Sequence, residues 1–332
     1  MDTDDSASEM EMDVDQSDLD SALGDDSASI RSLSLKSVAE EYEWKFGRRY
    51  HGFQPGTYSF PNDDLEQVRL EMIHHVFYRL LNDRLYLAPI TTAGLKVLDI
   101  GTGTGEWAIQ FADEHPEAAL VVRNDLSPIQ PSWSPANVRF MIDDVEMDWV
   151  EPQNYGYIHC RYMAGAIRDW TRLISQVFDN LEPGGWFEFQ ESENTLHSED
   201  GTLSPDSPMV EMMEGLIKAC DLLGRTMNPA PFMGRLLANI GFENVQEYRC
   251  KLPIGDWHQD PRLKEIGRLM AVNFVEGVEA FTASLFGDVL GWPQEDVKEL
   301  NRDVVDAVER RDTHAMFDFV VVVGQKPNTA FS

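Results

Sequence analysis

The chain has 332 residues, of which 42% are hydrophobic and 26% charged, and its formal net charge is −31 at pH 7. This length fits one large α/β domain or a domain with an appended helical part, and the acidity argues against direct binding of DNA or RNA, whose phosphates need clustered Lys and Arg. With no run of about 18 apolar residues, no signal-peptide pattern and no disulfide or zinc-ligand spacing among its three cysteines, we expect a cytoplasmic or nuclear protein that is not secreted, not membrane-bound and without a metal site.

The amino-terminal part divides into a tail and a cap. Eleven acidic residues precede the first basic residue, Arg31, so residues 1–37 are predicted to be a disordered, solvated acidic tail. Residues 38–92 are predicted to form an N-terminal helical cap, because apolar residues recur at helical spacing over 63–87. Asn62 or Asp63 is expected to cap that helix.

Residues 93–191 alternate between short apolar runs and helical segments. Strands are expected at 96–100, 119–122, 137–142, 155–160 and 186–190, with helices at 106–114 and 171–181. Such alternation predicts right-handed crossovers and a mainly parallel sheet covered on both faces.

Residues 192–332 are expected to add a helical insertion, or lid, and the strands that complete the same sheet. Helices are expected at 209–223, 232–239, 262–275 and 294–311, and strands at 242–252 and 315–324. The last run is continuous and β-branched, so it is predicted to be a late strand inserted into the sheet.

A glycine-rich turn joins the first strand of this core to its helix. The order strand, Gly-x-Gly-x-Gly, helix places backbone N–H groups against a ligand at the helix N-terminus, where a Cβ would block the approach. A dinucleotide site wants Gly-x-Gly-x-x-Gly, but position 106 is Glu. Three alternating glycines after an acid are instead typical of S-adenosylmethionine enzymes. We predict that this cofactor binds Asp99, Gly101, Thr102, Gly103 and Gly105; a turn without a ligand is the alternative.

Acids follow the next two strands as well. Asp125 lies twenty residues after Gly105, where a carboxylate can accept both ribose hydroxyls, and Leu126 follows it. Asp144 is predicted to bind the adenine amino group together with the backbone at Val145, with Asp143 as the second choice. The alternatives are ordinary turn and cap residues or a solvated acidic turn.

Two longer segments resemble class I methyltransferases: 181–186 looks like their turn into the fifth strand, and 238–245 like the approach to the sixth. More narrowly, the chain resembles the fungal LaeA-like methyltransferases over about residues 41–326. The carrying segments are Gly-Arg-Arg-Tyr-His (47–51), Tyr58 with Pro-Asn-Asp (61–63), Asp-Leu-Ser-Pro-Ile-Gln-Pro (125–131), Trp-His-Gln-Asp (257–260) and Gly-Trp-Pro (291–293). Arg123 departs from that pattern, since the family usually has Gly there; a long cation could pair with Asp125 or an acidic neighbour.

The resemblance implies a Rossmann-like class I fold, with a mainly parallel seven-stranded sheet, a late antiparallel strand and a helical lid. It implies an S-adenosylmethionine-dependent methyltransferase that methylates a small natural product in fungal secondary metabolism. Two alternatives stay open. One is a nuclear regulator of secondary-metabolite gene clusters that acts with velvet-type protein partners, and the other is a cofactor-binding protein without methyl transfer.

Methyl transfer is an in-line displacement, and a base is needed only if the nucleophile arrives protonated. No residue stands out as that base. The candidates are His159, which ends the fourth strand and could also contact the cofactor, His258 and Tyr58, and each has a structural role as the alternative. Methionine-rich stretches at 209–213 and 227–233 could line an acceptor pocket or simply pack in the core.

Overall fold

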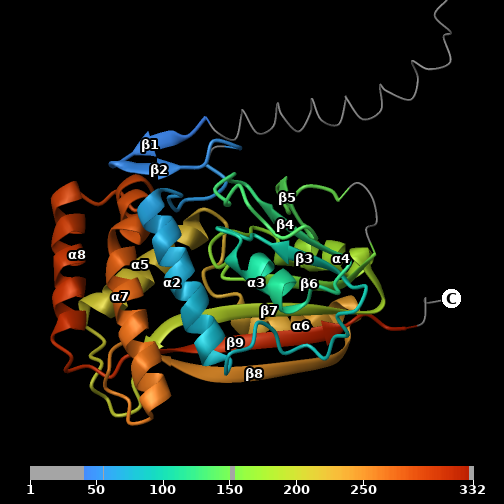
Figure 1. Ribbon diagram of the computed structural model, residues 1–332. Helices are drawn as coiled ribbons and strands as arrows, with labels where there is room; N and C mark the ends of the chain where they lie inside the picture. The colour runs from blue at the N-terminus through green and yellow to red at the C-terminus, as the bar shows by residue number, and fades with distance from the viewer. Residues whose placement is uncertain (1–40, 55, 150–153, 329–332) are drawn as a thin grey trace, which may run out of the picture.

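The computed structural model describes residues 41–54, 56–149 and 154–328 (Figure 1). The acidic tail predicted for residues 1–37 lies outside this part of the chain.

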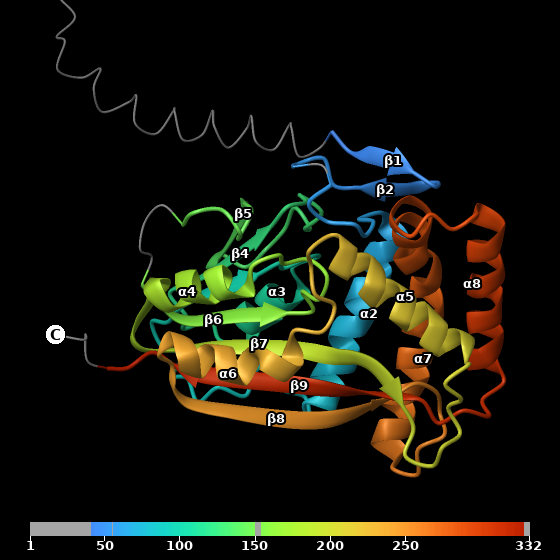
Figure 2. The same ribbon diagram turned by 180° about the vertical axis from the view of Figure 1, so that it is seen from behind.

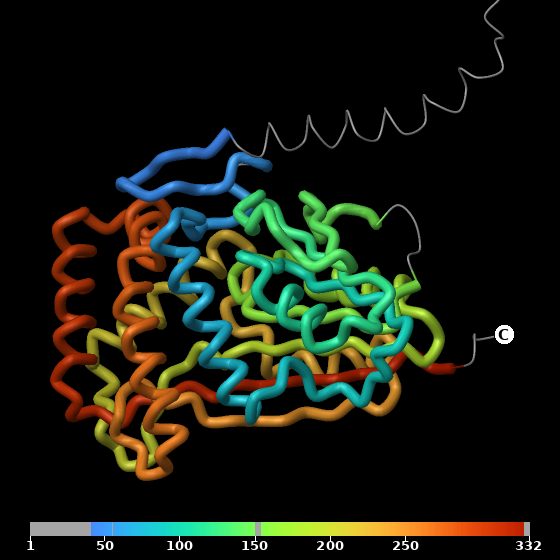
Figure 3. Tube along the Cα trace, in the orientation of Figure 1, coloured from blue at the N-terminus to red at the C-terminus, as the bar shows by residue number. Residues whose placement is uncertain are grey.

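A seven-stranded sheet with the order β5-β4-β3-β6-β7-β9-β8 forms the centre of the molecule. Its strands are β3 (Lys96–Ile100), β4 (Leu120–Asp125), β5 (Val138–Ile142), β6 (Tyr155–Arg161), β7 (Leu181–His197), β8 (Glu243–Pro253) and β9 (Met316–Gln325). The strands from β5 to β7 pair in parallel, whereas β9 lies between β7 and β8 and is antiparallel to both (Figure 3). The predicted mainly parallel sheet with a late antiparallel strand is therefore confirmed.

Helices cover both faces of the sheet. Successive strand residues point to opposite faces, so apolar residues that are neighbours in a strand pack against different helices. Val97 packs in one buried cluster with α2 and α3, whereas its neighbour Leu98 packs in another with α4 and α6. Figure 2 shows α4 and α6 on the face turned away from α2. The bounds of these helices are α2 (Asp64–Leu80), α3 (Glu106–Glu114), α4 (Trp170–Asn180) and α6 (Ala230–Ile240).

A further group of helices stands at one end of the sheet, beside α2 (Figure 1). It consists of α5 (Pro208–Leu222), α7 (Pro261–Ser284), a π-helical turn η1 (Leu285–Val289) and α8 (Gln294–Glu309). Pro261–Val289 is long and apolar enough to span a membrane by composition, but 50% of that apolar window is buried inside the protein, as in a core helix.

Helix α2 begins where the sequence predicts and ends earlier. The Asp63 side chain caps it by accepting the Glu66 N–H at 3.0 Å. The helix ends at Leu80 rather than continuing to residue 87, because Asn82 and Asp83 adopt left-handed backbone angles, with φ of 59° and 57°.

Three other features differ from the prediction. Residues expected to belong to the helical cap form a short antiparallel hairpin, β1 (Glu43–Lys45) with β2 (Arg48–Tyr50). Helix α7 runs nine residues beyond the predicted end at 275, to Ser284. Strand β7 continues to His197, so the boundary expected between residues 191 and 192 falls inside a strand.

Candidate functional site

The glycine turn after β3 adopts a backbone that only glycine takes up easily. Gly101, Gly103 and Gly105 all have positive φ, at 63°, 58° and 88°. A Cβ on Gly101 would lie 2.2 Å from the Met163 sulfur. At this turn the chain therefore brings its backbone closer to its neighbours than a side chain would permit.

Two residues at the end of β4 hold the turn in place. The Gly101 N–H donates to the Asn124 side-chain oxygen at 3.2 Å, and the Gly103 N–H donates to Asp125 Oδ2 at 2.8 Å. Asp125 Oδ1 accepts the Ser127 N–H at 2.9 Å. Burial raises the pKa of Asp125 to about 6, although these backbone N–H groups act to lower it. Asp125 lines a cavity, and each of its two carboxylate oxygens can accept a further hydrogen bond from a ligand there.

Two of the segments that carry the family resemblance, residues 61–63 and 125–131, meet at this corner. Gln130 Nε2 donates to the Gly103 and Ser127 carbonyl oxygens at 2.5 and 3.0 Å. Asn62 Nδ2 donates to Ser127 Oγ at 3.1 Å. The Ser-Pro-Ile-Gln-Pro stretch therefore joins the glycine turn to the segment that leads into α2.

The predicted adenine acids lie at the end of β5. Asp144 Oδ1 accepts the Glu146 N–H at 2.9 Å, and the Asp143 N–H donates to the Asp125 carbonyl oxygen at 3.1 Å. Burial raises the pKa of Asp143. Val145, 7% exposed, adds an apolar surface beside them.

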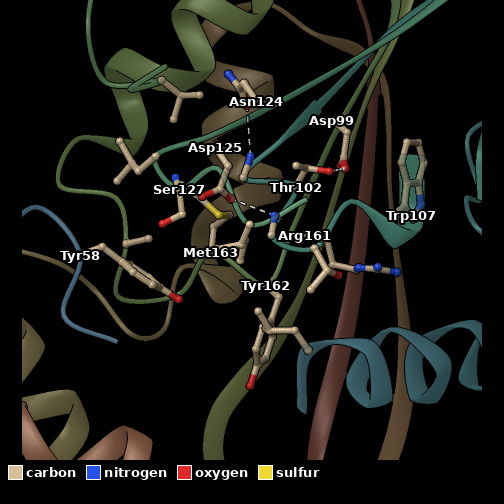
Figure 4. Close-up of a pocket in the computed structure, with 18 of the residues that line it drawn as sticks. Tyr58, Asp99, Thr102, Trp107, Asn124, Asp125, Ser127, Arg161, Tyr162 and Met163 are labelled. Atoms are coloured by element: carbon tan, nitrogen blue, oxygen red, sulfur yellow. Dashed lines mark hydrogen bonds between the residues drawn. The ribbon is translucent and has the colours of Figure 1, made fainter. Parts of the chain in front are cut away.

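These residues surround a cavity of about 1200 Å³, its open mouth included (Figure 4). Most of the predicted cofactor residues line it: Asp99, Gly101, Thr102, Gly103, Asp125, Leu126, Asp144, Val145 and His159. Gly105 instead lies behind the turn, where it begins α3 and packs against Arg123. All the residues of the wall lie between positions 57 and 167.

His159 lies beneath the turn and is fully buried. Its Nδ1 lies 2.7 Å from Asp99 Oδ1, and its ring stacks on Trp107 with centroids 3.9 Å apart. Asp99 also accepts the Thr102 hydroxyl at 2.6 Å. These contacts hold His159 as a support of the glycine turn, and its ring also forms part of the cavity wall.

The other two candidates for the base lie in different places. Tyr58 lines the cavity, and burial raises the pKa of its phenol, so it stays protonated. His258 lies outside the cavity, in the turn before α7, where its Nδ1 accepts the Asp260 N–H at 3.0 Å. A catalytic role for His258 is not supported.

Arg161 was not predicted as a site residue, although it is the last residue of β6. Its guanidinium lines the cavity and lies 2.7 Å from His74 Nδ1. Burial lowers the pKa of Arg161 to about 10 and that of His74 to about 3. Arg161 is therefore a cation paired with a neutral imidazole, and it can bind a carboxylate.

Arg123 does not make the ion pair with Asp125 that its position suggested. Its side chain is 3% exposed, and its Nε and Nη1 have no hydrogen-bond partner among the described residues. It lies beside Gly105 and over the Phe140 ring, at 5.9 Å from the ring centroid. Burial lowers the pKa of this guanidinium.

A second cavity, of about 680 Å³ with its open mouth included, adjoins the first. Tyr58, Ile73, Phe77 and Tyr162 line both. The second cavity extends between α2, α5 and α7, and Met213 and Met227 from the two methionine-rich stretches lie in its wall. The prediction that these stretches line a pocket holds for these two residues.

The charged side chains of the first cavity fit S-adenosylmethionine. Six acidic side chains of its wall (Asp99, Glu106, Asp125, Asp143, Asp144 and Glu146) suit a ligand with two positive groups, and Arg161 supplies a partner for the ligand carboxylate. The strand order, the glycine turn and the acids at successive strand ends together define a class I methyltransferase.

Comparison with known proteins agrees with this class. The sequence model of a family described as "Methyltransferase domain" matches residues 72–247. Methyltransferase pytC of Aspergillus terreus is 59% identical over 310 residues, which cover 93% of this chain and 95% of the relative. The secondary metabolism regulator laeA of Aspergillus fumisynnematus is 32% identical over 310 residues, covering 91% and 81%.

Among solved structures, phosphoethanolamine N-methyltransferase 2 of Haemonchus contortus in complex with S-adenosyl-L-methionine is 19% identical, with a TM-score of 0.47, covering 78% of this chain and 52% of that one. The family assignment rests on the sequence matches and not on this structural similarity. The chain belongs to the LaeA-like family of S-adenosylmethionine-dependent methyltransferases.

Proposed function

We propose that the protein transfers the methyl group of S-adenosylmethionine to a small natural product of fungal secondary metabolism. The observation that carries this proposal is the second cavity, which is lined mainly by buried side chains and shares four lining residues with the cofactor cavity. Its lining is mainly apolar and aromatic with a few polar side chains, which is typical of sites that bind small molecules.

The residues of the first cavity would hold the cofactor. We assign the ribose hydroxyls to Asp125, the adenine amino group to Asp144, the amino-acid end to the glycine turn and its carboxylate to Arg161. When bound, the cofactor supplies an electrophilic methyl group on a sulfonium. The chain contributes position and exclusion of water, and a well-oriented pair of reactants accounts for much of the barrier reduction in such reactions.

A regulatory role is the second candidate, because relatives at 31–34% identity are named secondary metabolism regulators or, in one case, a protein-methionine methyltransferase. The 59% identity to a protein named only as a methyltransferase favours the enzyme. Velvet-type partners and a nuclear location belong to the regulatory candidate.

Deletion of the gene followed by metabolite profiling separates the candidates. Loss of one methyl group from one compound supports the enzyme, whereas silencing of several pathways supports the regulator. Re-introducing the gene with Asp125→Asn adds a second test. Under the proposal this allele fails to restore the methylated compound, and full restoration would favour a role without methyl transfer.

A further inference from the structure

The two cavities meet between Tyr58 and Tyr162. Both side chains belong to both walls. Figure 4 shows the Tyr58 hydroxyl on the side of Tyr162, and the Tyr162 hydroxyl directed away from Met163 and the glycine turn. The two phenols therefore lie between the second cavity and the cofactor cavity.

The wall of the second cavity is mainly apolar beyond this junction. Its aromatic and sulfur-containing side chains offer flat and adaptable surfaces. They are Phe60, Phe274, Phe281, Phe317, Met213, Met227 and Met270. Such a wall fits a planar, aromatic or conjugated body rather than a sugar or a peptide.

Besides Ser192 and Asn194, this wall contains a polar cluster that is centred on Arg69. Arg69 is 3% exposed and forms two hydrogen bonds to the Glu66 carboxylate, at 2.6 and 2.9 Å. Its Nη1 donates to Asn273 Oδ1 at 3.1 Å and to the Tyr162 hydroxyl oxygen at 3.4 Å. The charge of Arg69 is thus balanced by Glu66, while its remaining donors orient Asn273 and Tyr162.

Tyr162 is held toward this cluster at a cost in backbone strain. Its φ of 59° is in the left-handed region, which a bulky side chain rarely adopts. Burial raises the pKa of Tyr162, so the phenol keeps its proton. Because its oxygen accepts from a guanidinium, its O–H is polarised into a stronger donor. The Tyr58 hydroxyl, which makes no hydrogen bond to other described residues, is a second donor at the same junction.

We propose that the second cavity binds a planar, largely apolar acceptor whose nucleophile is an acidic hydroxyl, a phenol or an enol, and that Tyr162 and Tyr58 bind its oxygen. This rests on the function proposed above. The acceptor loses its hydroxyl proton to solvent. Its oxygen then forms a bond to the methyl carbon as the sulfur–methyl bond breaks, and that electron pair stays on sulfur. Arg69 acts as a positioning residue through Tyr162.

Two small probes of similar size test this assignment without turnover. 4-Hydroxycoumarin carries an enol, and coumarin lacks it. With the protein saturated with S-adenosylhomocysteine, isothermal titration should show 4-hydroxycoumarin binding at least about tenfold more tightly, as expected for hydrogen bonds to an ionised oxygen. Tyr162→Phe should reduce that difference to about threefold or less while leaving coumarin binding unchanged.

A matched pair on α7 checks the location. Met270 lies in the cavity wall, whereas Val272, two residues along, is 44% exposed. Met270→Trp should weaken both probes by more than about tenfold, because the indole fills the cavity, and Val272→Trp should change neither. Retained binding of S-adenosylhomocysteine shows that each variant is folded.

Equal affinity for the two probes, binding of neither, or full binding in Met270→Trp would overturn the acceptor assignment. If S-adenosylhomocysteine itself does not bind the wild-type protein, the proposed function fails instead, so the two failures are distinguishable.

Discussion

The most direct test of the cofactor site is Asp125→Asn. The carboxylate uses one oxygen for the Gly103 N–H and the other for the Ser127 N–H, which leaves one lone pair on each for a ribose hydroxyl. An amide keeps only one acceptor oxygen, and its NH₂ group would face a backbone N–H. Hydrogen bonds to charged groups contribute about 1.5 to 3 kcal/mol each. Losing one to the ribose therefore weakens binding by about ten- to 150-fold.

The same residue predicts how binding depends on pH. The pKa of Asp125 is raised from 3.8 to about 6, so the carboxyl is protonated below about pH 6 in the empty site. Ribose hydroxyls donate to the charged form and therefore favour it. Affinity for S-adenosylhomocysteine should fall as the pH drops through about 6, by up to about tenfold per unit.

Isothermal titration from about pH 8 to about pH 5 measures both effects. The Asp125→Asn protein should bind weakly and without this pH dependence. Asp113→Asn, on the exposed side of α3, is the matched control and should behave as the wild type. Wild-type affinity in the Asp125→Asn protein, or the same pH profile in both, would refute the assignment of Asp125 to the ribose.

Three further substitutions test other parts of the site. Gly101→Ala should lower affinity for S-adenosylhomocysteine by more than about tenfold, because the new Cβ would lie 2.2 Å from the Met163 sulfur on a strained backbone. A second change, Met163→Ala, should restore part of the lost affinity, and the absence of any restoration argues against this clash. Arg161→Ala should weaken S-adenosylhomocysteine by about tenfold or more, yet change 5′-methylthioadenosine, which lacks the carboxylate, by no more than about twofold; equal losses would exclude the carboxylate contact. His258→Ala should leave S-adenosylhomocysteine affinity, measured by titration, within about twofold of wild type, and a large loss would return His258 to the site.

The cofactor residues could be predicted because each lies at, or just after, the carboxyl end of a strand. In a parallel sheet the carboxyl ends of neighbouring strands meet at one edge, so the spacing from Gly105 to Asp125 already implied that these residues lie together. The late strand was equally clear, since Val320 to Val323 form a β-branched run that suits a strand buried on both faces.

The acceptor cavity could not be predicted in the same way. Arg69 contacts Tyr162 and Asn273, which are 93 and 204 residues away along the chain. No local pattern encodes such a cluster, because it depends on how α2 and α7 pack beside the end of β6. Arg161 was missed for a related reason: its role follows from facing the cavity, and a strand-ending cation alone does not reveal that. By contrast, Asn82 and Asp83 were a local signal for the end of α2. The prediction passed over this signal because apolar residues continued at helical spacing to residue 87.

The place of β9 has a consequence for how the protein is made. The wall of the cofactor cavity is complete by residue 167, but Met316–Gln325 lies between β7 and β8 and pairs with both. During synthesis the cofactor-binding half of the chain emerges from the ribosome long before β9, the strand that completes the sheet, has been made. Until then β7 and β8 have unpaired edges, which are prone to aggregate. Nascent chains of this protein are therefore expected to depend on chaperones, or on bound cofactor, until the final strand is inserted.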